Sequence, residues 1–160
     1  MHQLSQPKLD KLSAITVEYL RNVDWVLPVV GQQERTVTNH SVGPAIENLT
    51  EGLREPHLVI RYDGKLNPRS ILRHGMNFLP DVEVYMFTQK CLAIEVKILR
   101  DSDASGSLTK AVGQTFLYKA LGFESAIVLI FDIRKNKRSG LQQTLDELSQ
   151  FDDRVNFIVI

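Results

Sequence analysis

Two adjacent segments near the middle of the chain combine a strand-like hydrophobic pattern with a turn between them. In 77–87, valine and methionine alternate with glutamate and tyrosine, and 88–90 then turn into the apolar run CLAIEVKIL at 91–99. A period of two is typical of strands, and a short polar turn joins antiparallel neighbours. The two segments therefore predict a hairpin. One face of its second strand is expected to carry Cys91, Ala93, Glu95 and Lys97.

Apolar residues at helical spacing predict helices on both sides of this hairpin. The expected helices cover 10–23, 44–55, 107–122 and 141–150. Asp10 and Ser107 suit helix caps, Pro44 suits a first helical turn, and Pro56 ends the second helix. Residues 25–42 contain Pro28, Gly31 and several polar side chains, so we expect irregular structure there, with a short strand at 26–30 as an alternative.

The remaining apolar segments predict strands and complete an α/β pattern. Residues 57–62 and 155–160 have strand composition, and 126–133 (AIVLIFDI) has the continuous apolar character of a strand buried on both faces. The helix between the hairpin and 126–133 is long enough to be a crossover between parallel strands. We therefore expect a mixed sheet flanked by helices, with an extra N-terminal helix and a C-terminal helix-strand unit.

Composition narrows the class of protein without identifying it. A chain of 160 residues, 43% hydrophobic and 24% charged, is typical of one globular domain, here taken as 1–160. No apolar run is long enough to span a bilayer, and the first residues lack a secretory apolar region, so we expect a cytoplasmic (intracellular) protein with no membrane partner. The lone Cys91 excludes an intrachain disulfide and a cysteine-rich zinc site.

Charge is balanced overall but unevenly distributed. The formal net charge is zero, which gives no global attraction for nucleic acid. Basic residues nevertheless gather in 61–73, which ends with Arg73, and in 134–138. Each cluster is either a local nucleic-acid contact or ordinary solvated surface.

Three charged residues of the predicted hairpin can converge. Glu95 and Lys97 are two apart on one strand and share a face, and Asp81 lies near the start of the partner strand. Two carboxylates on one surface can bind a hard divalent cation such as Mg²⁺. Such a cation polarises a phosphate and activates water, while a lysine can stabilise the developing charge. A purely structural interpretation also exists, with Asp81 in a turn and Glu95 and Lys97 in a surface ion pair.

The pattern Pro80-Asp81, thirteen residues and Glu95-Val96-Lys97 resembles the signature of PD-(D/E)XK nucleases. This resemblance covers roughly 43–133 and implies a restriction-endonuclease-like αβββαβ core with the acidic residues on its second and third strands. It also implies that Asp81, Glu95 and the Val96 carbonyl bind the metal, and that Lys97 positions water or stabilises charge. Many members carry a glutamate on the first core helix, for which Glu47 is the candidate and Glu51 the alternative.

The helix after the hairpin carries a second family-like motif. Lys110, Gln114 and Tyr118 recur every four residues and share a helical face. Gln114-Thr-Phe-Leu-Tyr118 resembles the Gln-x-x-x-Tyr motif of RecB-like members, where both residues flank the site. The resemblance thus implies nucleic-acid contacts from Gln114 and Tyr118, and the tyrosine ring can stack on a base. Lys110 and Arg73 are further expected nucleic-acid contacts.

These observations favour a Mg²⁺-dependent deoxyribonuclease. The expected activity is endonucleolytic hydrolysis of DNA phosphodiester bonds, with Mn²⁺ able to replace Mg²⁺. Restriction, homing, resolvase and defence roles all stay open, as does a homo-oligomer, either dimer or tetramer, for cutting both strands. The alternative is a catalytically silent nucleic-acid-binding or complex-forming subunit. No Gly-rich phosphate loop, nucleophile elbow or zinc spacing supports an unrelated enzyme class.

Overall fold

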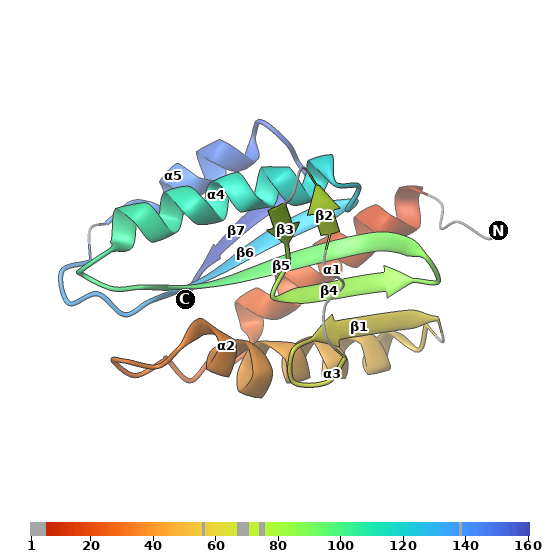
Figure 1. Ribbon diagram of the computed structural model, residues 1–160, viewed down its shortest axis with the longest axis horizontal. Coiled ribbons are helices and arrows are strands. Elements are labelled where there is room, and N and C mark those ends of the chain that lie inside the picture. Colours follow the sequence, from red (N-terminus) through yellow and green to blue (C-terminus); the bar gives the residue numbers. More distant parts are fainter. Residues whose placement is uncertain (1–5, 56, 67–70, 74–75, 138) are drawn as a thin grey trace.

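The computed structural model describes residues 6–55, 57–66, 71–73, 76–137 and 139–160. It has the expected α/β architecture, with helices on both faces of a mixed sheet (Figure 1). The helices are α1 (Gln6–Asn22), α2 (Glu34–Val37), the π-helix η1 (Thr38–Val42), α3 (Gly43–Leu53), α4 (Ala104–Ala120) and α5 (Leu141–Ser149). The strands are β1 (Leu58–Tyr62), β2 (Ile71–Arg73), β3 (Met76–Phe78), β4 (Val82–Met86), β5 (Gln89–Leu99), β6 (Ser125–Asp132) and β7 (Val155–Val159).

Five of the described strands form one sheet in the order β1-β4-β5-β6-β7. The β1–β4 and β4–β5 pairs are antiparallel, whereas β5–β6 and β6–β7 are parallel. The predicted hairpin and the predicted crossover helix are therefore confirmed, because β4 turns directly into β5 and α4 joins β5 to β6. The interior strand β6 is buried along its whole length, as its apolar sequence indicates.

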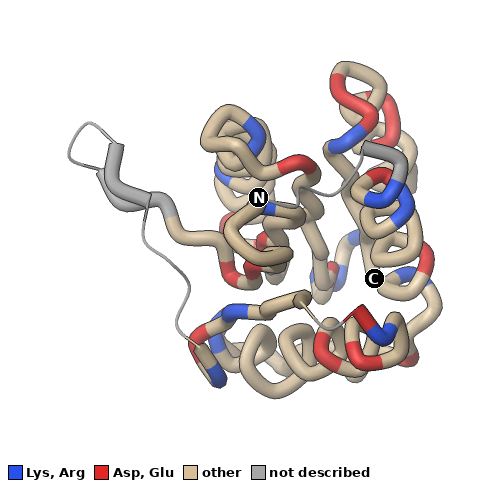
Figure 2. Tube along the Cα trace, turned by 90° about the vertical axis from the view of Figure 1, so that its right-hand side faces the viewer, with Lys and Arg blue, Asp and Glu red and all other residues tan. Residues whose placement is uncertain are grey.

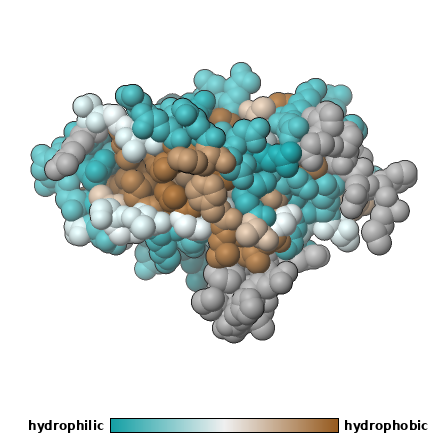
Figure 3. Space-filling view, turned by 90° about the horizontal axis from the view of Figure 1, so that it is seen from above, coloured by the Kyte–Doolittle hydropathy of each residue, from teal (hydrophilic) through white to brown (hydrophobic). Residues whose placement is uncertain are grey.

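The core lies in two layers, one on each face of this sheet. On one face, Leu20 of α1 and Ile46 of α3 pack with Ile94 of β5 and Leu129 of β6. On the other face, residues of α4 and α5 such as Ala111 and Leu145 pack with Val128 and Ile130 of β6 and Phe157 of β7. Part of this second layer reaches the surface, where apolar side chains gather over α4 and α5 (Figure 3).

The segment before α3 is the largest departure from the expected secondary structure. In place of irregular structure, one helical run extends from Glu34 through η1 into α3. Pro44 has no N–H to bond the carbonyl four residues earlier, and the wider turns of η1 accommodate that missing bond. The apolar residues 26–30 form no strand. The helical run ends at Arg54, which has a left-handed φ of 52°.

Helix boundaries and one strand face also differ from the sequence pattern. Helix α1 extends to Gln6, so Asp10 is inside it, and α4 begins at Ala104, so Ser107 bonds Asp103 from within the first turn.

A bulge between Val84 and Tyr85 leaves Cys91 opposite no residue of β4. Because a bulge changes the side to which a strand residue points, Cys91 packs in the same core layer as Leu92 and not with Ala93.

Charged residues of both signs are distributed over the surface. Figure 2 shows Lys and Arg interspersed with Asp and Glu along the described trace, in agreement with the zero net charge. Any recognition of a charged ligand must therefore be local. Among the described residues, no helix combines the length and the apolar composition that crossing a bilayer requires.

Candidate active site

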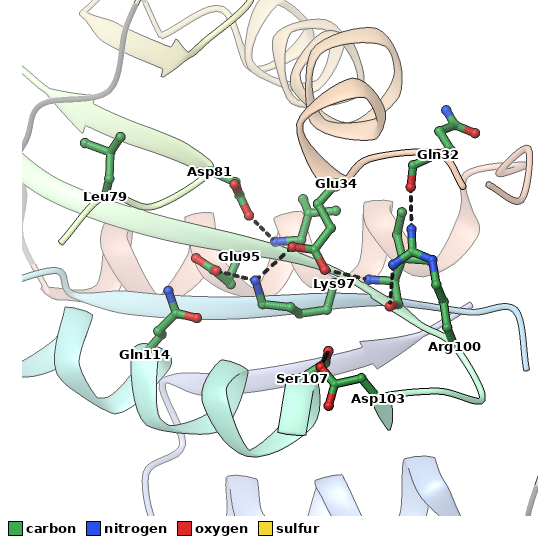
Figure 4. Close-up of polar contacts among 12 residues, drawn as sticks. Gln32, Glu34, Leu79, Asp81, Glu95, Lys97, Arg100, Asp103, Ser107 and Gln114 are labelled. Carbon is green, nitrogen blue, oxygen red and sulfur yellow. Dashed lines mark hydrogen bonds and ion pairs between the residues drawn. The ribbon is translucent and has the colours of Figure 1, made fainter. Parts of the chain in front are cut away.

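The candidate site lies where β5 extends beyond its antiparallel partner. The β4–β5 ladder ends with the pair Val82 and Ile94, whereas β5 continues to Leu99. Two backbone N–H groups along the uncovered part of this edge, those of Val96 and Ile98, donate to side-chain carboxylates. The acceptors are Asp81 Oδ2, at 2.7 Å, and Glu34 Oε1, at 3.2 Å (Figure 4).

These two carboxylates take the place of a neighbouring strand. A buried N–H without an acceptor is costly, so an acidic side chain that bonds it contributes to stability. Asp81 can do so because it directly precedes β4, at the point where Pro80 and Asp81 bring the chain to the edge. Glu34 can do so because it is the first residue of α2, which contacts β5.

Lys97 lies between two further carboxylate contacts. Its ammonium nitrogen is 2.7 Å from Glu95 Oε1 and 3.2 Å from Glu34 Oε2. Glu95 and Lys97 are buried, at 3% and 6% exposure. The structural interpretation of the sequence expected Glu95 and Lys97 to form a surface ion pair, whereas the pair is buried. Because burial removes the solvation of both charges, each is stabilised by its partner.

The electrostatic environment shifts the pKa values of Asp81 and Lys97. Burial, followed by repulsion from Glu95, raises the pKa of Asp81 to about 7, although the Val96 N–H favours its charged form. Burial lowers the pKa of Lys97, but attraction to Glu95, Glu34 and Asp81 outweighs it, so the net shift is upward. Lys97 is therefore a firmly protonated cation, while Asp81 is a carboxyl group that titrates near neutrality.

Helix α4 orients Glu95 from the opposite side. The Tyr118 hydroxyl donates to Glu95 Oε2 at 2.8 Å and also lies 3.2 Å from the Leu79 carbonyl oxygen. Gln114 Nε2 approaches the same hydroxyl at 3.4 Å. Burial, with the nearby Glu95 charge, raises the pKa of Tyr118, so the phenol stays neutral and donates its proton. The helix face that carries Gln114 and Tyr118 therefore contacts Glu95 through the Tyr118 hydroxyl.

Burial decides which of the residues expected to contact nucleic acid are accessible to it. Tyr118 is 1% exposed and packs with Phe123, so its ring cannot stack on a base and it serves instead to position Glu95. Gln114 is half-buried, and its Oε1 atom is buried with no hydrogen-bond partner among the described residues. Lys110 is exposed on α4. Arg73 lies in β2, but its side chain falls outside what the structure describes.

The structure does not place Glu47 with this cluster. Its carboxylate forms an ion pair with Lys65, at 2.5 Å, and after burial its charge is the next cause that raises the pKa of Tyr62. Glu51, the alternative, is exposed on the same helix. Glu34 supplies the helix carboxylate instead, since the helical run begins there and not at Pro44. The sequence signal for Glu34 was an acidic residue in a first helical turn, which was hidden because Pro44 indicated a later start.

The donor set suits a divalent cation in charge and chemistry. Glu34, Asp81 and Glu95 provide three carboxylates against the single ammonium of Lys97, which leaves a formal surplus of two negative charges. Oxygen ligands of this kind are those that Mg²⁺ prefers. The Val96 carbonyl faces the same open edge as its N–H, since both groups of a strand residue point to one side. Within the described ranges, no three acidic, histidine or cysteine side chains already converge as a metal site.

Comparisons with known proteins do not assign the chain to a family. No protein-family model, no curated protein and no solved structure matches the chain. The functional argument therefore rests on the residues of the site and their contacts.

Proposed function

We propose that this protein is a divalent-metal-dependent deoxyribonuclease, with Mg²⁺ as its cofactor and Mn²⁺ as a substitute. One observation carries the proposal: Glu34, Asp81, Glu95 and Lys97 all lie at the uncovered edge of β5, with surplus negative charge. Structure alone gives little reason to place a buried carboxylate and two partly buried ones at one strand edge, because burying charge has a desolvation cost. A cation and a phosphodiester would complete the charge balance.

Each residue has a role that follows from its contacts. Asp81 and Glu95, with Glu34 and the Val96 carbonyl, would hold the metal, which when bound supplies Lewis acidity toward phosphate and water. Lys97 remains protonated beside Glu95, so its ammonium can bind a phosphate oxygen and stabilise developing negative charge. The Tyr118 hydroxyl fixes the Glu95 carboxylate, and such supporting hydrogen bonds tune metal ligands.

The order of elements supports the same proposal. The run α3-β1-β4-β5-α4-β6 has the αβββαβ order of the restriction-endonuclease-like core, with β2 and β3 inserted between β1 and β4. Asp81 directly precedes the second strand of this run, and Glu95 and Lys97 lie on the third. The Gln114–Tyr118 face of α4 also lies at the acidic cluster, as the resemblance to RecB-like nucleases implies.

One observation favours the catalytically silent alternative. Lys97 is held in ion pairs with Glu34 and Glu95, and within the described residues no three metal-ligating side chains converge as a metal site. A nuclease fold that only binds nucleic acid could keep this arrangement for stability. Assays of metal binding and DNA cleavage distinguish this silent subunit from the proposed nuclease.

The decisive experiment compares cleavage of supercoiled, linear, single-stranded and branched DNA in Mg²⁺, Mn²⁺ or EDTA. We expect metal-dependent cutting, and a loss of at least about 100-fold in Glu95→Gln and Lys97→Met, because one preorganised charged group contributes at that level. Glu18→Gln and Lys11→Met, which change exposed residues of α1, are matched controls and should keep full activity. Equal cutting by all variants, or no cutting together with metal-independent DNA binding, would exclude the proposed chemistry.

A further inference from the structure

An exposed apolar loop projects beside the candidate site, between α1 and α2. Four of the five residues 26–30 are exposed hydrophobics: Val26 at 85%, Leu27 at 46%, Val29 at 69% and Val30 at 86%. We call 26–30 the apolar tip. Single exposed apolar residues are ordinary, but a contiguous group on a soluble surface usually marks an interaction site.

The apolar tip is held in place from both ends. Before it, the Trp25 indole donates to the Leu20 carbonyl and packs edge-on against Phe131 in the core. After it, the Gln32 side chain accepts from the Val29 N–H and the Gln32 N–H donates to the Val29 carbonyl. Gly31, with a φ of 89°, permits this turn. The exposed side chains are therefore presented by an ordered loop.

Hydrogen bonds connect this loop to the site and to the loop after β6, residues 134–137, which we call the basic loop. Arg100, directly after β5, donates to the Gln32 carbonyl, and Glu34 two residues later contacts Lys97. Asp101, the residue after Arg100, accepts a hydrogen bond from the backbone N–H of Lys135. In Figure 1 the loop before α2 and the loop after β6 lie at the same end of the molecule, where β5 and β6 end.

The basic loop offers exposed cations beside the apolar tip. Lys135 and Lys137 are exposed. The neighbouring Arg134 is occupied by Asp132, to which it donates two hydrogen bonds of 2.8 Å. Arg134 thereby neutralises the carboxylate that would otherwise oppose an anion here, although Asp101 is a second acidic neighbour.

We propose that the apolar tip inserts between the bases of a DNA duplex, next to the phosphodiester at the candidate site, while Lys135 and Lys137 bind the duplex backbone. Aliphatic side chains cannot bond phosphate, but they can wedge between bases and unstack them. The lysines bind phosphate without regard to sequence. The choice of DNA as the partner rests on the proposed function, and local basic contacts agree with a chain of zero net charge.

The test uses the full chain and short duplexes that carry 2-aminopurine at successive positions, with EDTA present to prevent metal-dependent cutting. Unstacking raises 2-aminopurine fluorescence. We expect the rise with the unchanged protein and its loss in Val26→Ser/Val30→Ser, together with roughly tenfold weaker binding. Phe151→Ser is the matched control, because Phe151 is 82% exposed but precedes β7, at the opposite end of the parallel strands. Equal unfolding midpoints will establish that all variants fold.

The lysines give an independent readout. In Lys135→Met/Lys137→Met, the slope of log affinity against log salt should fall by about 2, roughly one for each lost phosphate contact, whereas the tip variant should keep the slope. The proposal is overturned if the tip variant binds and unstacks DNA like the unchanged protein. It is equally overturned if the tip substitutions alter only the association of the chain with itself or with anionic phospholipid vesicles.

Cleavage of supercoiled plasmid by the same preparations separates this inference from the proposed function. Tip-dependent unstacking without any metal-dependent cutting would support the inference and refute the nuclease. Metal-dependent cutting with unstacking and affinity that are unaffected by the tip substitutions would support the nuclease and refute the inference.

Discussion

Asp81 combines a structural and a chemical role in one side chain. Its carboxyl oxygen accepts the Val96 N–H at 2.7 Å, so it completes hydrogen bonding at the uncovered edge of β5. The same position, largely shielded from water and near Glu95, raises its pKa to about 7. The ionised form is therefore less stable in the folded protein than in water, unless a cation is bound.

This shift predicts how the stability of the metal-free protein depends on pH. The folded state binds the Asp81 proton more tightly than the unfolded state, so the penalty is absent below about pH 4 and develops as pH rises toward 7. Asp81→Asn, which keeps an acceptor for Val96, should raise the free energy of unfolding at pH 8 by on the order of 2 kcal/mol, since one pKa unit corresponds to about 1.4 kcal/mol. Urea unfolding in EDTA at pH 4 and pH 8 measures it.

Asp81→Ala is the control for this prediction. It removes the acceptor as well as the charge, so it should lower stability at pH 4, where the unchanged side chain is protonated. If Asp81→Asn gives the same stability difference at both pH values, the pKa of Asp81 is not raised by its surroundings.

At the scale of elements, the approach of α3 to β1 places the helical run that carries Glu34. A Cβ atom on Gly43 would lie 2.7 Å from ring atoms of Tyr62, so α3 packs on β1 at a distance that only glycine allows. Tyr62 is buried at 5% exposure and has little room to move. The π-helical η1 then connects this packed point to α2 and Glu34.

Substitution of glycines in α3 tests this packing. Gly43→Ala should lower the free energy of unfolding by about 1–3 kcal/mol, the usual range for overpacking a filled site. Gly52→Ala in the same helix meets nothing within 4 Å and should be stabilising by about 0.5–1 kcal/mol, because alanine favours helix more than glycine does. Chemical denaturation of both variants checks the pair, and a neutral Gly43→Ala would contradict the close contact.

At the scale of the whole molecule, β6 joins the two core layers. Leu129 packs with α1 and α3 on one face, while its neighbours Val128 and Ile130 pack with α4 and α5 on the other. A sheet that shares an interior strand between two layers should unfold as one unit. The candidate site lies on β5, directly beside this strand.

The cooperativity of this core is measurable through the single tryptophan. Leu129→Ala should lower the free energy of unfolding by about 2–5 kcal/mol, as for other buried leucines. Trp25 contacts Phe131 of β6, so tryptophan fluorescence and far-ultraviolet circular dichroism should shift to the same new midpoint. Phe151→Ala, at an exposed position, should change stability by less than about 0.5 kcal/mol. Separate midpoints for the two signals would show that the layers unfold independently.

The sequence by itself determined the elements whose signal is local. The hairpin of β4 and β5, the crossover α4 and the buried β6 follow from hydrophobic periodicity and length, and so the mixed α/β class was predictable. Asp81, Glu95 and Lys97 were predictable as neighbours because strand geometry places them within reach. The helical spacing of Gln114 and Tyr118 likewise predicted their contact.

Tertiary structure alone decided which residues complete the site and what each can do. Glu34 reaches β5 from more than sixty positions away because η1 accommodates Pro44 and extends the helical run, which no local pattern indicates. Glu47 faces Lys65 and Tyr62 instead. Tyr118 was expected to stack on a base, but it is buried, and its hydroxyl bonds Glu95 instead. These outcomes depend on long-range packing and on the dielectric environment it creates, and neither is encoded in the spacing of residues along the chain.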